Sequence, residues 1–275
     1  MYDYVQNVLT DNRYSMKPLK TIIAMASAAL AFSACCNCNS TEPAIPQDKD
    51  IEAKIEKVLK GMTLEEKVGQ MTQLNATAVA HGVKITEAGE SALRDYKIGS
   101  VLNTPGDIAQ TPEKYNEFIS EINRISIEAC GIPTLYGLDH IHGVTYVAGG
   151  TLFPQEVNIA ATFNRDHAYN MGKVTAYESR AANVPWTFSP TMDLGRNPEW
   201  PRMWESFGED TYVNAQMAVA EVKGMQGDDP SHVGPYNIAA CAKHFMGYGV
   251  PVTGQDRTPS SIAASELREK HFEPF

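Results

Sequence analysis

The stretch TLYGLDHIHG, residues 134–143, contains the unit from which this chain is built. Its first part is apolar and predicts a short buried strand over residues 134–139. The strand ends at Asp139 and runs directly into a polar loop with two histidines, His140 and His142. A helix over residues 112–129 is expected before it, because a proline stands in its first turn and apolar residues recur along one face.

The order strand, loop, helix recurs along the chain. Besides the unit above, strands are expected over residues 98–102, 186–190 and 237–244, and helices over 51–61, 64–74, 164–182, 211–226 and 261–272. Such alternation predicts a parallel sheet with helices outside. Polar groups follow the strand ends, which is where a (β/α) barrel builds its sites. A doubly wound sheet would also gather them there, but neither a dinucleotide-binding glycine motif nor a P-loop follows the first strand.

The charge balance bears on the class of partner. The chain has 23 Lys and Arg against 33 Asp and Glu, which gives a net charge of −10. Nucleic-acid phosphates require a basic face, so we expect no nucleic-acid partner. The length of 275 residues suits one large α/β domain or two small ones.

The N-terminus predicts export and not a part of the fold. Two lysines between Met16 and Lys20 precede an apolar run over residues 22–32, and small residues follow. This is the arrangement of a signal peptide, and the run is too short for a membrane-spanning helix. Met16 is a natural start, so residues 1–15 are interpreted as a misassigned beginning.

The cleavage region resembles a bacterial lipobox, FSAC, at residues 32–35. In a lipobox the cysteine becomes the lipidated first residue, so Cys35 is the predicted lipidation site. The position three before Cys35 is Phe where Leu is usual, and plain cleavage with secretion is the alternative. The expected organisation is a leader over 1–35, a linker over 36–50 and a single domain over 51–275, in a periplasmic or outer-membrane-anchored protein held to the membrane only by its lipid.

The remaining cysteines and the histidines give no metal site. Cys130 and Cys241 lie in the body of the chain, and Cys241 stands in an apolar run, so it is interpreted as a small buried hydrophobic residue. No Cys/His spacing typical of metal binding is present. For His140 and His142, structural hydrogen bonding is favoured over metal ligation.

The stretch NPEWPRMWESFGED, residues 197–210, is rich in aromatic and charged residues. Flat apolar faces with charged groups at their edge suit a sugar or another polyol. Arg202 is the predicted ligand contact, although a structural pair with Glu205 is the simpler interpretation and both can hold. Glu205, Glu209 and Asp210 are interpreted as carboxylates that hold the loop in shape.

Two further strand ends supply candidate ligand-binding groups. Asp139 can accept hydrogen bonds from two neighbouring hydroxyls, or it can simply cap the following turn. Lys243 and His244 can donate to sugar hydroxyls, or they can form an exposed strand terminus. The residues therefore predict a polyol or sugar pocket, and they reveal no pair of catalytic groups.

Several ordered motifs of the chain resemble the N-terminal domain of family 3 glycoside hydrolases, the β-glucosidase group. They are MTLEEKVGQM at 62–71, GLDHIHG at 137–143, FP at 153–154, AATF at 160–163, the aromatic stretch at 197–210 and AKHF at 242–245. The resemblance runs from about residue 51 to residue 275.

The resemblance implies a (β/α)8 barrel of the TIM type and a retaining mechanism that needs no metal or cofactor. Asp139, Arg202, Lys243 and His244 would bind the non-reducing-end sugar of a β-linked glucoside in subsite −1. The family's nucleophilic aspartate lies in a Ser-Asp-Trp-like strand end, which this sequence lacks, and its acid/base glutamate comes later still. Both are therefore expected beyond Phe275, so that the barrel is incomplete, with an unpaired strand edge and poor solubility, and the chain alone is inactive.

Other functions remain open. A β-xylosidase is a close neighbour, since a pocket without room for the C6 hydroxymethyl group would select pentosides. A β-N-acetylglucosaminidase is disfavoured, because Asp256 has no histidine three residues later. From another class, a non-catalytic, sugar-binding surface lipoprotein is the alternative.

Overall fold

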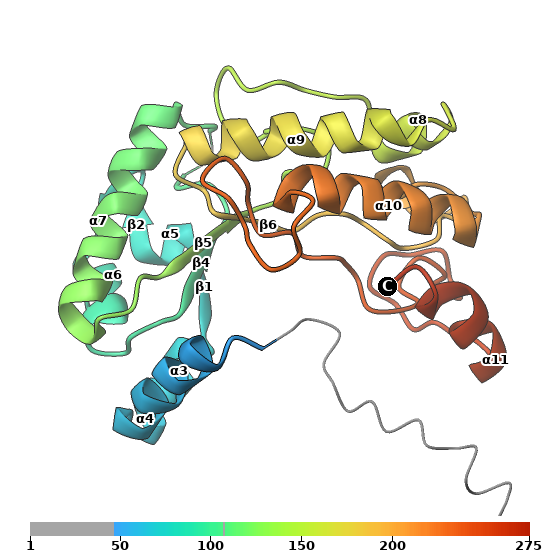
Figure 1. The fold of residues 1–275 in the computed structure, drawn as a ribbon. Helices are drawn as coiled ribbons and strands as arrows, with labels where there is room; N and C mark the ends of the chain where they lie inside the picture. The colour runs from blue at the N-terminus through green and yellow to red at the C-terminus, as the bar shows by residue number, and fades with distance from the viewer. Residues whose placement is uncertain (1–46, 107) are drawn as a thin grey trace, which may run out of the picture. The chain divides into compact units, whose positions relative to one another are not determined.

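A computed structural model describes residues 47–106 and 108–275 (Figure 1). The predicted signal peptide, Cys35 and nearly all of the predicted linker lie outside these residues. Helix α3 (Lys49–Gly61) begins within the last two residues of the predicted linker, with the Asp48 side chain accepting from backbone amides of its first turn. The next helix, α4 (Leu64–Gln70), begins with the predicted capping box, in which Thr63 and Glu66 exchange hydrogen bonds of 3.0 and 3.2 Å.

Four short parallel strands form the sheet, which confirms the predicted topology. The strands are β1 (Gln73–Asn75), β4 (Ser100–Leu102), β5 (Leu135–Leu138) and β6 (Trp186–Thr187), in the order β1-β4-β5-β6. Beyond β6 the chain at Ala239 and Lys243 makes isolated parallel bridges to Trp186 and Thr191. The carboxyl ends of all these segments therefore lie at the same edge, as in a (β/α) barrel.

Helices cover the sheet from outside. In Figure 1, α9 (Arg165–Ala181) lies beside α10 (Thr211–Gln226), and α6 (Glu87–Arg94) lies beside α7 (Pro112–Cys130). The remaining elements are short: α5 (Ala76–Val79), the antiparallel pair β2 (Ala80–His81) and β3 (Lys84–Ile85), α8 (Glu156–Ala160), the 3₁₀ turn η1 (Met203–Glu205), α11 (Ala264–Glu266) and the π-helical turn η2 (Leu267–Phe272).

Several predicted boundaries were wrong. The helix expected over residues 64–74 ends at Gln70, and β1 follows it, because parallel pairing with β4 overrides helix propensity in so short a stretch. The strand expected over 237–244 is extended but makes only isolated bridges, and the strand expected over 186–190 ends at Thr187. The helix expected over 261–272 begins at Ala264 and continues as a π turn.

The main core is apolar and lies between the sheet and helices α5 to α7. Its largest fully buried members include Tyr115, Phe118, Ile122, Tyr136 and Leu138. Sterics require glycine at position 137 in β5, since a Cβ added there would lie 2.5 Å from the Phe188 ring. That close approach lets two neighbouring segments converge at the strand ends.

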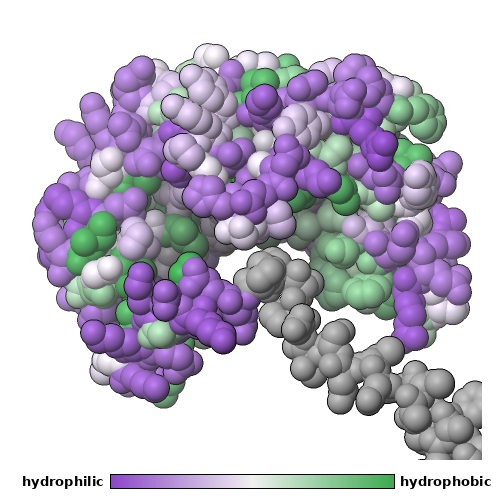
Figure 2. Space-filling model, viewed as in Figure 1, coloured by the Kyte–Doolittle hydropathy of each residue, from purple (hydrophilic) through white to green (hydrophobic). Residues whose placement is uncertain are grey.

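An apolar groove borders the sheet beside β1. Among the described residues, β1 pairs with β4 and with no other strand, as expected for an open edge. The apolar residues that line the groove are Leu64, Val68, Leu74, Ala92, Tyr96 and Ile98. Figure 2 shows hydrophobic patches exposed among hydrophilic residues on this face of the molecule. Over the part of the chain with described coordinates, no helix is long and apolar enough to cross a membrane.

Candidate functional site

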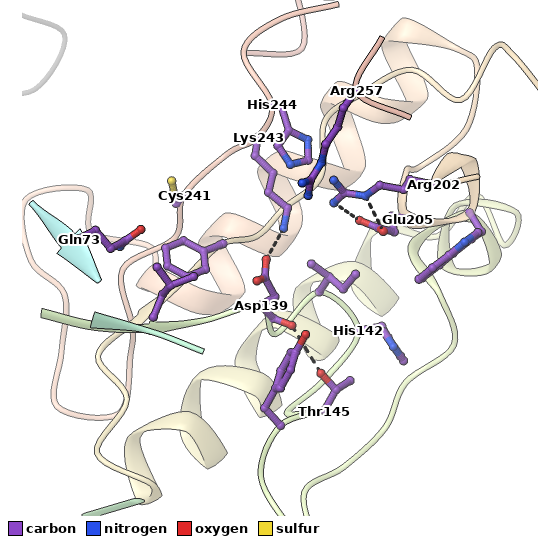
Figure 3. Close-up of a pocket in the computed structure, with 15 residues that line it drawn as sticks. Gln73, Asp139, His142, Thr145, Arg202, Glu205, Cys241, Lys243, His244 and Arg257 are labelled. Atoms are coloured by element: carbon purple, nitrogen blue, oxygen red, sulfur yellow. Dashed lines mark hydrogen bonds and ion pairs between the residues drawn. The ribbon is translucent and has the colours of Figure 1, made fainter. Parts of the chain in front are cut away.

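All four predicted ligand-binding residues line one cavity of about 630 Å³ at the carboxyl ends of the strands (Figure 3). Asp139 follows β5, Arg202 comes from the aromatic stretch, and Lys243 with His244 comes from the extended segment beyond β6. The remaining lining residues are Gln73, Leu102, Ile141, His142, Thr145, Tyr146, Phe188, Trp204, Glu205, Cys241 and Arg257.

An ion pair joins two of these residues across the cavity. The Lys243 ammonium lies 2.5 Å from Oδ1 of Asp139, although the two residues are 104 positions apart. Parallel strands bring them together, because β5 and the segment at 243 both end at this edge of the sheet. Asp139 therefore faces the cavity with its charge balanced and does not act merely as a turn cap.

Arg202 is held in the cavity wall by Glu205 of η1. Two parallel hydrogen bonds of 2.8 and 2.6 Å join the guanidinium to the carboxylate, and a third of 3.2 Å runs to the Tyr248 hydroxyl. These bonds, the one to Glu205 foremost, raise the pKa of Arg202. The structural pair with Glu205 is confirmed, and Arg202 also lines the cavity, so its contact with a ligand stays a prediction.

His244 is oriented by a buried carboxylate. Its Nδ1 lies 2.6 Å from Oδ2 of Asp193, and its backbone amide donates to the same oxygen at 3.2 Å. Asp193 is almost fully buried, so its charge is directed at His244 and away from solvent. The sequence gave no indication that Asp193 and His244 would be partners, because they are 51 positions apart.

Behind Arg202, Tyr248 and Trp200 make a second set of hydrogen bonds that was not predicted from the sequence. The Tyr248 hydroxyl and the Trp200 indole both donate to Oδ1 of Asp256, the latter at 3.0 Å. These bonds, that of Tyr248 first, lower the pKa of Asp256. Trp200 of the stretch at 197–210 thus serves partly to hold the loop at 248–257, a contact that no signal in the sequence indicated.

Some predicted roles are corrected or refined. Cys241 was expected to be a buried hydrophobic residue, but it is partly exposed and lines the cavity, because its segment passes the strand end. Asp210 lies outside the cavity lining and caps α10, accepting from the Val213 amide at 2.8 Å. Glu209 is likewise outside the cavity lining.

The two histidines after β5 make structural hydrogen bonds, as predicted. His140 is fully buried with its Nδ1 2.7 Å from the Ser179 hydroxyl, and burial lowers its pKa to about 3, so the ring is neutral. His142 contacts the Phe153 carbonyl at 2.9 Å. Among residues 47–106 and 108–275, no group of three or more His, Cys, Asp or Glu side chains is arranged to hold a metal.

The cavity wall alternates cationic donors with anionic acceptors. Lys243 stands beside Asp139 and Arg202 beside Glu205, while Tyr146, Phe188 and Trp204 supply aromatic faces. Charge-assisted donors and acceptors beside flat apolar faces match the edge and the faces of a pyranose ring. A lone phosphate or carboxylate would find Lys243 and Arg202 already paired.

Comparisons with known proteins find relatives over most of this chain. A lysosomal β-glucosidase of Dictyostelium discoideum is 40% identical over 236 residues, which cover 80% of this chain and 28% of that protein. A β-xylosidase of Formosa agariphila is 26% identical over 86% of this chain and 27% of its own length. The solved exo-1,3/1,4-β-glucanase of a Pseudoalteromonas species superposes with a TM-score of 0.75 at 31% identity, covering 85% of this chain and 29% of that one.

The chain thus spans under a third of the length of these relatives. A family model described as the glycosyl hydrolase family 3 N terminal domain matches residues 63–275. With the parallel sheet and its helices, these findings confirm the TIM-barrel-type fold. The chain belongs to glycosyl hydrolase family 3 and carries its N-terminal domain.

Proposed function

We propose that the protein to which this chain belongs releases terminal β-D-glucose from β-glucosides or oligosaccharides, and that the cavity binds the non-reducing-end sugar in subsite −1. The observation that carries the proposal is the convergence of Asp139, Arg202, Lys243 and His244 on one cavity, each with a paired partner. The family membership and the β-glucosidase relatives support the same reaction class.

In this proposal the described residues bind and orient the sugar. Asp139 has oxygen lone pairs to accept from two neighbouring hydroxyls, while Lys243 and Arg202 donate to ring substituents. A retaining reaction also needs a nucleophilic carboxylate and an acid/base carboxyl about 5–5.5 Å apart. Asp139 and Glu205 are each engaged by a cation, so we expect this chain by itself to bind sugar without hydrolysing it.

A pentoside is the second candidate substrate, supported by the β-xylosidase among the relatives. Glucose and xylose differ only in the C6 hydroxymethyl group, so the two activities are separated by whether the pocket favours that group. Binding of glucose and of xylose to the same preparation distinguishes them, and full-length protein assayed on aryl β-glucosides and β-xylosides gives the matching kcat/KM ratio.

The Asp139→Asn variant tests the sugar site. Losing the carboxylate removes charge-assisted hydrogen bonds, so affinity for methyl β-D-glucoside should fall by about 10- to 100-fold, equivalent to about 1.5–3 kcal/mol. Titration calorimetry on the chain, and kcat/KM on the full-length protein, measure the change. Asp166→Asn, at an exposed position in the first turn of α9, is the matched control and should bind as the parent does. Equal affinities of the two variants for the glucoside would show that this cavity is not the sugar-binding site.

We further infer export with lipidation at Cys35, which rests on the sequence pattern at residues 16–35. Cells fed a labelled fatty acid should incorporate it into the protein and retain it in the membrane fraction. Cys35→Ser should lose both, whereas Cys130→Ser should lose neither. Secreted, unlabelled parent protein would contradict lipidation and favour plain cleavage.

A further inference from the structure

A second cavity adjoins the sugar site. It has a volume of about 430 Å³ and shares three lining residues, Arg202, His244 and Arg257, with the cavity of about 630 Å³ described above. Figure 3 shows Arg257 beside His244 and Arg202. Its volume lies within the range of small-molecule pockets, so a ligand whose sugar fills the first cavity can extend into the second. Arg257 was not among the residues predicted from the sequence to bind a ligand.

The two cavities differ in chemistry. The sugar cavity has two carboxylates, Asp139 and Glu205, which can accept hydrogen bonds from hydroxyl groups. The residues that line the second cavity include no aspartate or glutamate. Besides the three shared residues they are Phe245, Met246, Gly247, Tyr248 and Ser260. Cationic donors beside apolar surface, without carboxylate acceptors, favour a ligand group that is apolar and anionic.

Phe245 supplies exposed aromatic surface in the second cavity. The residue is 66% exposed, and its ring packs edge-on against the rings of Phe272 and Phe275, with centroids 6.0 and 5.3 Å away. These two contacts hold the ring in place while it stays accessible. A fixed, accessible aromatic ring is a suitable contact for another flat ring.

The charge of Arg257 is less compensated than the charges of the other two cations at the site. Lys243 and Arg202 each lie within 2.6 Å of a carboxylate oxygen. Arg257 lies 3.6 Å from Oδ2 of Asp256, which is too far for a hydrogen bond, and its side chain is 82% exposed. Oδ1 of Asp256 already accepts from two aromatic side chains. The guanidinium of Arg257 therefore keeps its planar set of donors for a ligand.

The loop at residues 251–260 holds the backbone of Arg257 where the two cavities meet. The hydroxyls of Thr253 and Thr258 lie 2.8 Å apart, and the Thr258 hydroxyl donates to the Gln255 carbonyl at 2.7 Å. Arg257 has a φ of 59°, in the left-handed region that residues other than glycine rarely adopt. Such a conformation persists where the surrounding structure fixes it, and it is frequent at ligand-binding positions.

We propose that the second cavity takes the leaving group of the β-glucoside, and that Arg257 determines specificity there by binding a carboxylate on a flat, apolar leaving group, such as a hydroxybenzoic acid. This rests on the proposed function, because the second cavity takes a leaving group only if the first takes the terminal glucose. In this arrangement the ring of the leaving group contacts Phe245, and its carboxylate accepts from the guanidinium of Arg257.

The net charge of the chain cannot account for such a preference. At −10 it disfavours anions, so a preference for a carboxylate has to come from cations close to the bound group. Because Arg257 is largely exposed, solvent and salt screen its charge. The expected preference is therefore modest, about fivefold at low ionic strength, and it should fall toward one at about 0.5 M salt.

The test compares two glucosides of nearly equal size, 4-carboxyphenyl β-D-glucoside and its neutral analogue 4-carbamoylphenyl β-D-glucoside. Titration calorimetry on the chain at pH 7, at low and at high salt, gives the ratio of the two affinities. The parent should favour the carboxylate by about fivefold at low salt and lose this preference at high salt. The ratio of kcat/KM values of the full-length protein for the same two compounds should show the same preference.

Three variants identify the cation responsible. Arg257→Gln should bring the affinity ratio to about one, and Arg257→Lys should keep part of the preference, since an ammonium keeps the charge but loses the planar fork. Arg268→Gln, at an exposed position in η2, removes the same charge outside both cavity linings and should keep the parent ratio. A parent ratio near one, an unchanged ratio in Arg257→Gln, or an equal loss in Arg268→Gln would overturn the proposal.

The outcomes also separate this proposal from the proposed function. If methyl β-D-glucoside binds and Asp139→Asn weakens it, while the two aryl glucosides bind equally, the role of Arg257 fails and the sugar site stands. If the parent binds no glucoside, the proposed function fails and the leaving-group role of the second cavity fails with it. Binding of 4-hydroxybenzoate that is lost in Arg257→Gln would then still show a carboxylate site at Arg257.

Discussion

The two halves of the described fold bury different kinds of side chain. Around β1, β4 and β5, the interior is apolar and includes Phe118, Ile122 and Leu138. Around α8 to α10, the apolar clusters are smaller, and Glu156, Asp193 and Glu221 are buried beside them. The first half supplies stability through apolar burial, whereas the second keeps polar and ionisable groups out of water beside the candidate site.

Hydrogen bonding sharpens this contrast. In the first half, the buried tyrosines Tyr115 and Tyr136 donate their hydroxyls to the backbone carbonyls of Tyr146 and Asn103. The second half leaves several buried oxygens without a partner among the described residues, at Glu156, Thr191, Asp193, Asn214 and Glu221. Unpaired buried polar atoms reduce stability, and they cluster where a structure serves function. The stability of this fold is therefore expected to depend mainly on its first half.

The largest expected effect is a cavity in the apolar half. Ile122 in α7 is 0% exposed, so Ile122→Ala should lower the free energy of unfolding by about 2–5 kcal/mol. Chemical denaturation at pH 7 measures this change. Ile127→Ala, on the same helix at 51% exposure, is the matched control and should cost little.

Sugar binding by the Ile122→Ala variant is the second measurement of this experiment. Ile122→Ala should leave affinity for methyl β-D-glucoside nearly unchanged while the protein remains folded, because Ile122 lies outside the cavity lining. A loss of affinity as large as that of Asp139→Asn would mean that the two halves are coupled, and the contrast between them would fail.

Lowering the pH is expected to have a smaller effect on the free energy of unfolding, through His140. The folded-state pKa of His140 is about 3 and its ordinary value is 6.5, so its contribution to stability is present above pH 6.5 and is lost as pH falls toward 3. Between pH 7 and pH 5 this loss is about 2 kcal/mol, because only the unfolded state takes up the proton.

His140→Gln isolates this contribution. Its free energy of unfolding should lose the histidine-dependent slope between pH 5 and pH 7, whereas the control His232→Gln, at an exposed position, should keep the slope of the parent. Parallel curves for the parent and His140→Gln would show that the folded-state pKa of His140 is close to its ordinary value.

Much of the fold could be predicted from local pattern. The helix at Pro112 was correct to within a residue at its end, and that at Thr211 was correct at both ends, because proline, N-cap and periodicity signals are local. Strand β1 was missed, since three residues carry too little pattern and only pairing with β4 defines them. The extended segment before Lys243 was wrongly predicted as a strand for the converse reason, because its apolar pattern is present while regular pairing is not.

In the candidate site, the cavity-lining residues could be predicted from the sequence, but the residues that hold them could not. Asp139, Arg202, Lys243 and His244 were predicted from strand-end position and family motifs, and the structure brings all four to one cavity. Their partners were harder to find, because the Tyr248–Asp256 contact and the Asp193–His244 contact depend on how distant loops fold back.

The sequence by itself determined the family, the parallel alternation of strands and helices, and the identities of the candidate sugar-binding residues, because these are written in ordered motifs and local periodicity. Tertiary structure alone decided which groups meet. Glu221 looks like any helix glutamate in the sequence, and only the packing of α10 against α9 and residues 189–193 makes it a buried carboxyl. Burial is a property of the surroundings, and it is burial that sets the charge of such a group.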